Sequence, residues 1–296
     1  TEIHAAFEQL QLDLAGEISD AMLSARKALL ENFDEEVQER LRIAKQDATT
    51  SLDRMERLLN ELAHLSREAG ELPGFNHAFF KPREGARVDL VLVTADRGLC
   101  GGFNANLIRR GVQYLRENPG KDIRVWCVGK KGRDFFRRFY KKIDGEYVNI
   151  FQKLSYAQAE LIGADVIKTF LTTDTTSVIF LYNEFKSRLQ QKLIMRQILP
   201  VADVPGVEPK TDFIYEPNRA AILDELLPRH VYAQIFRILL ESQSAELAAR
   251  MAAMDSATNN AKDLIQSLTL TMNKVRQANI TRELAEIVGG AAALQG

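Results

Sequence analysis

The C-terminal quarter of the chain carries an unusually long helical pattern of hydrophobic and polar positions. From Arg229 to Leu294 it contains no proline, and its glycines are Gly289 and Gly290. One continuous helix is therefore predicted, and at 1.5 Å per residue it would be about 100 Å long. A compact protein of this length has a radius of gyration of about 19 Å. Most of such a helix must therefore project from the body that carries it.

Two helical segments have patterns that fit each other as a coiled coil. Small and medium apolar residues recur at steps of three and four along the C-terminal segment, at Ala249, Ala253, Ala257, Ala261, Leu264, Leu268, Met272 and Val275. Alanines in such a seam let a partner helix approach closely. Residues 5–69 also lack proline and have Gly16 as their only glycine. They are interpreted as one rod or as a hairpin of two helices, because residues 47–52 are types that both interrupt and cap helices.

The middle of the chain alternates between strand and helix patterns. Runs of β-branched or aromatic residues at 88–93, 123–128 and 177–182 alternate with helical patterns at 104–117, 132–140 and 156–172, and further strands are predicted at 192–199 and 212–215. This order is typical of an α/β fold with a sheet covered on both faces. The prediction is a Rossmann-like, mostly parallel head at 71–217. A long N-terminal helix or hairpin at 1–70 and a long C-terminal helix at 218–296 flank it as an antiparallel coiled coil.

Composition narrows the functional classes. The 296 residues are 46% hydrophobic and 27% charged, which suits a folded domain with helical extensions. The chain shows neither a long apolar run nor a secretory signal, so a cytosolic or equivalent location is expected. The net charge is −1, but residues 1–71 hold 16 acidic residues against 8 basic ones. This asymmetry is typical of solvated helix faces, and nucleic-acid binding is not predicted.

No constellation of reactive side chains points to catalysis. The four histidines are scattered, and no serine lies in a GxSxG motif. Cys100 and Cys127 each lie among apolar residues and are predicted to be buried, reduced thiols. No catalytic residue, metal site or cofactor is therefore predicted.

The segment from Thr94 to Asn104 follows the first strand and opens a helix, as phosphate-binding loops do. A triphosphate loop needs Lys followed by Ser or Thr after its last glycine, whereas this turn has Phe103 and Asn104. We expect Gly98, Gly101 and Gly102 to permit a tight turn and Asn104 to cap the helix. Nucleotide binding at 98–104 is the enzyme-class alternative.

The C-terminal tip is apolar, although chain termini are ordinarily polar. A polar band from residue 273 gives way to an apolar end at residue 294. One interpretation is a tip folded back on the head. The length of the predicted rod favours burial inside another protein.

Two separated motifs resemble the gamma-subunit family of rotary ATP synthases. They are DRGLCGGFN at 96–104 and KVRQANITRELAEIVGGAA at 274–292, and the resemblance covers residues 75–296. Residues 1–70 do not match the family's N-terminal pattern.

The resemblance implies a non-catalytic central rotor stalk that couples proton-driven rotation of the c ring to ATP synthesis in the alpha/beta ring. It implies contacts with alpha, beta, epsilon and c subunits, and a peripheral place on the cytoplasmic face of a bacterial inner membrane, or its organellar equivalent, through partners alone. Its ring-binding residues correspond to Arg276, Gln277, Thr281 and Glu283, and its apolar tip to Ile287, Val288 and Leu294. A gamma-like structural or regulatory coiled-coil protein with a different partner is the alternative.

Overall fold

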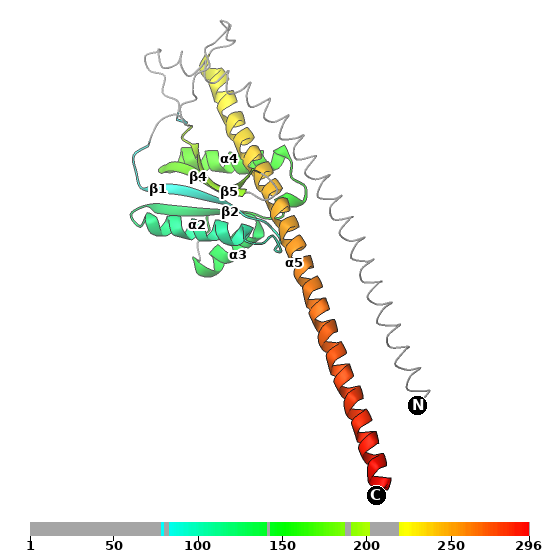
Figure 1. Ribbon diagram of the computed structural model, residues 1–296. Coiled ribbons are helices and arrows are strands. Elements are labelled where there is room, and N and C mark those ends of the chain that lie inside the picture. The colour runs from blue at the N-terminus through cyan, green and yellow to red at the C-terminus, as the bar shows by residue number, and fades with distance from the viewer. Residues whose placement is uncertain (1–77, 80–82, 141–142, 187–190, 202–218, 296) are drawn as a thin grey trace.

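The computed structural model describes residues 78–79, 83–140, 143–186, 191–201 and 219–295, with the side chains of 219–223 and 292–295 left aside. Within these ranges a sheet carries helices on both faces, and one long helix passes the sheet and continues far beyond it (Figure 1). The predicted N-terminal helix or hairpin and the predicted strand at 212–215 lie outside the described residues.

The described part of the head consists of five strands, three helices and a short 3-10 turn. In chain order these are β1 (Arg87–Val93), α2 (Phe103–Glu117), β2 (Asp122–Val128), α3 (Lys130–Phe139), β3 (Gly145–Tyr147), η1 (Ile150–Gln152), α4 (Tyr156–Thr172), β4 (Thr175–Phe185) and β5 (Gln191–Leu199). The predicted strands at 88–93, 123–128, 177–182 and 192–199 and all three predicted head helices are present. The elements β3 and η1, each three residues long, were not predicted because segments so short carry no periodicity.

The sheet is mostly parallel, as predicted. The strand order is β3-β2-β1-β4-β5, in which β1 pairs in parallel with β2 and β4, and β5 is an antiparallel edge strand beside β4. Alternate residues of β1 face opposite sides. Val91 and Val93 join a core cluster with α4 and α5, while Leu90 and Leu92 join a second cluster with α2 and α3. The sheet is therefore buried on both faces.

The C-terminal helix α5 (Arg219–Gln295) is a single element of 77 residues, about 115 Å long at 1.5 Å per residue. The helix begins before the proline-free stretch that opens at Arg229 and runs through Pro228. A proline inside a helix costs about 3 kcal/mol because it removes a backbone hydrogen bond and crowds the preceding turn. Leu227 and Val231 on either side are completely buried in the core that α5 shares with α4. This burial offsets the cost.

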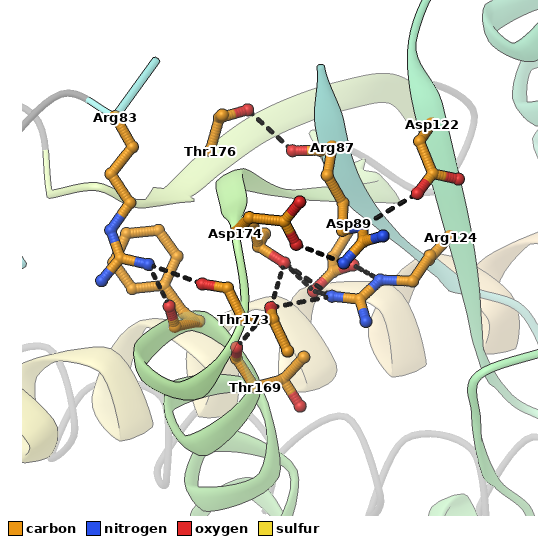
Figure 2. Close-up of polar contacts among 11 residues, drawn as sticks. Arg83, Arg87, Asp89, Asp122, Arg124, Thr169, Thr173, Asp174 and Thr176 are labelled. Carbon is orange, nitrogen blue, oxygen red and sulfur yellow. Dashed lines mark hydrogen bonds and ion pairs between the residues drawn. The ribbon is translucent and has the colours of Figure 1, made fainter. Parts of the chain in front are cut away.

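A buried polar network joins the amino-terminal ends of three strands (Figure 2). Arg124 of β2 donates two hydrogen bonds to Asp89 of β1, at 2.8 and 3.1 Å, and a third, at 2.6 Å, to the hydroxyl of Thr175 in β4. Burial raises the pKa of Asp89, while the guanidinium of Arg124 acts in the opposite direction. Because these partners satisfy one another inside the protein, the network fixes the alignment of β1, β2 and β4.

Candidate functional site

The part of α5 beyond the head carries most of the exposed large apolar side chains of the described residues. We call residues 227–248 the head-bound half of α5 and residues 255–291 the free shaft. The free shaft is exposed throughout, apart from half-buried Thr258 and Asn273, and would extend about 55 Å. Its exposed large apolar side chains are Leu264, Ile265, Leu268, Leu270, Met272, Val275, Ile280, Leu284, Ile287 and Val288. Exposed apolar surface of this extent marks an interaction site.

The expected ring-binding residues form two rows along the free shaft. At 100° per residue, Arg276, Glu283 and Ile287 form one row, and Gln277, Thr281 and Val288 form a second row about 120° around the helix from it. All six side chains are exposed. The hydroxyl of Thr281 donates to the carbonyl oxygen of Gln277 at 2.9 Å. Leu294 lies in the last turn of α5, where side chains are outside the description.

The turn at 94–104 lies at the carboxyl end of β1, about 50 Å along α5 from these residues. Gly101 adopts φ 54°, in the left-handed region that favours glycine, and so does the exposed Leu99 at 64°. Gly98 and Gly102 do not have a left-handed φ, and Gly102 occupies the capping position of α2. The turn therefore needs glycine most clearly at residue 101.

Asn104 does not cap α2, contrary to the prediction. It lies inside the helix, and its side-chain oxygen accepts a hydrogen bond from the backbone N–H of Ala95 at 2.9 Å. Its amide nitrogen lies 3.3 Å from the carbonyl oxygen of Arg97 and 3.1 Å from Sγ of Cys100. Asn104 thus closes the turn from within the helix, a role that its position in the sequence does not distinguish from capping.

The turn is fastened to α5 just beyond its head-bound half. Arg250 donates to the carbonyl oxygen of Gly98 at 3.3 Å and forms an ion pair with Glu246 one turn earlier. A cavity of about 280 Å³ beside this junction is lined by Asp96, Ser242 and other residues. The N–H groups of Ala95 and Phe103 are already bonded within the turn, unlike the free N–H groups of a phosphate loop. The junction is therefore suited to holding the head against the shaft.

The basic and aromatic character of α3 was missed by the sequence reasoning. Residues 130–142 read KKGRDFFRRFYKK, with seven basic residues and one acidic residue. Lys130, Lys131, Arg137, Arg138 and Phe139 are exposed on α3. The local charge was hidden by the near-neutral total, and a local count along the chain would have found it.

Both cysteines are buried free thiols, as predicted. Burial raises the pKa of Cys127 to about 12, so its thiol is protonated at neutral pH. Within the described ranges, no group of three or more His, Cys, Asp or Glu side chains is placed to hold a metal ion.

None of the described helices combines the length and apolar character needed to cross a bilayer.

Comparison with known proteins relates these features to one family. Residues 37–294 match the family model described as ATP synthase. The ATP synthase gamma chain of Heliobacterium modesticaldum is 43% identical over 239 residues, covering 78% of this chain and 82% of the relative. That of Chlorobaculum tepidum is 46% identical over 223 residues, covering 72% and 76%.

Solved structures show the same fold. A chain of the Euglena gracilis mitochondrial ATP synthase aligns with a TM-score of 0.56 and 21% identity, covering 90% of this chain and 95% of that one. A chain from the central stalk and c-ring structure of the Tetrahymena thermophila mitochondrial ATP synthase aligns with a TM-score of 0.51 and 22% identity, covering 75% and 99%.

Proposed function

The chain belongs to the ATP synthase gamma-chain family, and we propose that it is the non-catalytic central rotor stalk of a proton-driven ATP synthase. The observation that carries this proposal is the free shaft. Its apolar side chains are exposed along the part of α5 that lies beyond the hydrophobic core of the head. A surrounding assembly would bury them.

The free shaft exposes apolar residues on more than one side. Leu268 belongs to the predicted alanine-rich seam, whereas Leu270, two residues later, lies on the far side of the helix and is also exposed. One partner helix covers one side. Residues 1–70 are proposed to lie antiparallel along the seam, with 71–217 forming the head and 218–296 the long helix. The alpha and beta subunits would then enclose the remaining sides.

Coupling would follow from the asymmetry of this shaft. Each beta subunit meets a different face of the shaft as it turns, and that face biases the subunit between open and closed states. Arg276, Gln277, Thr281 and Glu283 would form hydrogen bonds with the ring. Ile287, Val288 and Leu294 would form an apolar end of the shaft. Because this end would lack deep pockets, no single rotational angle of the shaft would be favoured. The head would contact the epsilon subunit and the c ring, and the chain would then lie peripherally on the cytoplasmic face of a bacterial inner membrane or its organellar equivalent.

The test is Arg276→Ala in the assembled complex. Loss of a charged hydrogen bond of about 1.5–3 kcal/mol should lower ATP turnover about tenfold or more. The matched control is Arg282→Ala, because Arg282 lies about 120° around the helix from both rows and its ion pair with Glu286 is long, at 3.9 Å, and exposed. Unfolding of the isolated chain should change in neither variant.

Two results would count against the proposal. Equal ATP turnover in Arg276→Ala and Arg282→Ala would contradict the proposed hydrogen bonds between Arg276 and the alpha/beta ring. A chain that is expressed with its alpha and beta subunits but elutes apart from them would favour the alternative, a gamma-like coiled-coil protein with another partner.

A further inference from the structure

An apolar groove lies on the outer surface of the head, between α2 and α3. Its floor is formed by Ala105, Ile108 and Val112 of α2 and by Phe135 of α3, and its volume is about 640 Å³. The three α2 positions are three and four residues apart, so they form one stripe along the helix. This surface lies on the opposite side of the sheet from α4 (Figure 1). Its lining shares no residue with the free shaft or with the turn at 94–104.

The apolar surface continues beyond the groove. The ring of Phe139 packs on that of Phe135 with a centroid distance of 4.7 Å, and its own side chain is 61% exposed. Neighbouring Tyr140 is also exposed. An aromatic ring left in water next to a recessed apolar floor is typical of an interface.

The charges around the groove are mostly positive, and three of the arginines have no carboxylate partner among the described residues. Arg110, Arg133 and Arg137 nearby are paired with Glu117, Asp134 and Glu146. By contrast, Arg109 and Arg116 line the groove, and Arg138 lies 5.6 Å from the ring of Phe139. Within the described ranges these three form no ion pair with a carboxylate. The groove thus combines an apolar floor with a cationic rim.

We propose that this α2–α3 groove binds an acidic amphipathic helix of a partner subunit. An amphipathic helix in a groove places residues at i, i+3, i+4 and i+7 on the apolar floor. The apolar stripe of α2 runs from Ala105 to Val112, so it would face about two turns of a partner helix. Aspartate and glutamate beside the partner's apolar stripe would face Arg109, Arg116 and Arg138.

The shape of the site favours a helix over the other anionic partners of basic surfaces. A lipid surface is flat and contacts protruding groups, whereas Val112 and Ile108 form the floor of a hollow. Nucleic-acid affinity comes chiefly from contacts with phosphates, and a recessed apolar floor contributes little to it. The groove therefore best fits a partner with one face that carries both apolar side chains, which would contact the floor, and acidic side chains, which would contact the rim.

The first experiment uses the full-length chain and a defined probe. A labelled synthetic helix with leucine at i, i+3, i+4 and i+7 and glutamate elsewhere should bind saturably, and salt should weaken the binding. Arg109→Glu with Arg116→Glu should weaken it at least about tenfold, or about 1.4 kcal/mol. The matched control is Lys153→Glu with Lys168→Glu, two exposed lysines outside the groove, which should leave the affinity unchanged.

Several outcomes would overturn the proposal. Equal binding of a probe with lysine in place of glutamate would show that charge does not select the partner. Unchanged affinity in the double arginine variant would show that the probe binds elsewhere. Binding of phosphatidylglycerol vesicles or of a DNA duplex that the double arginine variant abolishes, without binding of the acidic helix, would assign the surface to a membrane or nucleic acid.

The second experiment uses the assembled complex. A photo-crosslinking residue in place of Val112 should form an adduct with an acidic helical peptide of another subunit, identified by mass spectrometry. An adduct with a peptide that lacks acidic residues, or no adduct at all, would overturn the groove proposal. Because ATP turnover and its dependence on Arg276 are measured on the same complex, such a failure is distinguishable from failure of the rotor assignment.

Discussion

The two halves of α5 lie in opposite surroundings, although one uninterrupted helix contains both. In the head-bound half, Val231, Ile235 and Leu239 are completely buried in the core shared with the sheet and α4. In the free shaft, Leu270 and Ile287 are more than half exposed. The first half is stabilised within its own chain, whereas the second leaves its apolar side chains exposed. A continuous helix is therefore not necessarily buried by its own chain along its whole length.

The burial pattern explains the difference. In the head-bound half, three consecutive residues, Ile238, Leu239 and Leu240, are all buried, as in a helix that packs on several sides. In the free shaft, apolar positions alternate with polar and charged ones, and no described core reaches them. The polar positions allow the free shaft to meet water, and the apolar ones define where a partner must contact it.

The largest effect should come from truncating the same side chain in each half. Leu239→Ala is expected to lower the free energy of unfolding by about 2–5 kcal/mol, because the leucine is completely buried. Leu270→Ala removes the same atoms from a side chain that is 63% exposed, so a change within about 0.5 kcal/mol is expected. Urea unfolding of the full-length chain measures both, with the single tryptophan, Trp126, reporting on the head.

Similar losses in the two variants would break the comparison. They would show that the free shaft is covered in the isolated chain, and a partner would then not be needed to bury it. A loss only in Leu239→Ala would sharpen the comparison, because it would leave Leu270 available to the assembly.

The strands of the head could be predicted from sequence because strands that are buried on both faces consist of nearly continuous runs of apolar residues. Val88 to Val93, for example, is buried on both faces and reads as β-branched and aliphatic residues around one acidic residue, Asp89. Asp89 finds its partners, Arg124 and Thr175, on other strands. Those pairings depend on strand order, which local patterns do not contain.

The parts that could not be predicted depend on contacts between distant segments. Pro228 reads as a helix breaker, and only packing against α4 allows α5 to continue through it. Asn104 reads as a cap, and only the fold of the turn brings Ala95 to its side chain. The α2–α3 groove requires two helices that the sequence separates by a strand. The shaft residues 276–288 were placed through a resemblance, and their contacts remain a prediction.

A second, smaller difference should appear on acidification. Burial lowers the pKa of His230, in the head-bound half, to about 4, whereas the free shaft contains no histidine. The neutral imidazole is therefore favoured by folding. This contribution is complete above pH 6.5, the ordinary histidine pKa, and is lost as the pH falls from 6.5 to 4. Between pH 7 and pH 5, the loss should be about 2 kcal/mol.

Unfolding measured at intervals from pH 7 to pH 5 tests this assignment. His230→Gln removes the titrating group and should flatten that part of the profile, whatever its effect on stability at pH 7. If the variant keeps the slope of the unmodified chain, other groups cause the acid sensitivity and His230 does not distinguish the two halves.

The smallest effect should come from adding one methyl group in the turn at 94–104 and, separately, one in the free shaft. The change in stability should have opposite signs at the two places. Gly101→Ala places a side chain at φ 54°, which should cost about 1–2 kcal/mol of stability in the turn that contacts the shaft. Gly290→Ala adds the same group in open space within the helix, where alanine is favoured over glycine by about 1 kcal/mol. Urea unfolding should show the loss for Gly101→Ala and no loss for Gly290→Ala, whose gain should appear as increased helicity in circular dichroism. A loss of head stability in Gly290→Ala would mean that the tip contacts the head, as the folded-back interpretation requires. A gain in helicity alone would agree with a tip that extends free of its own chain.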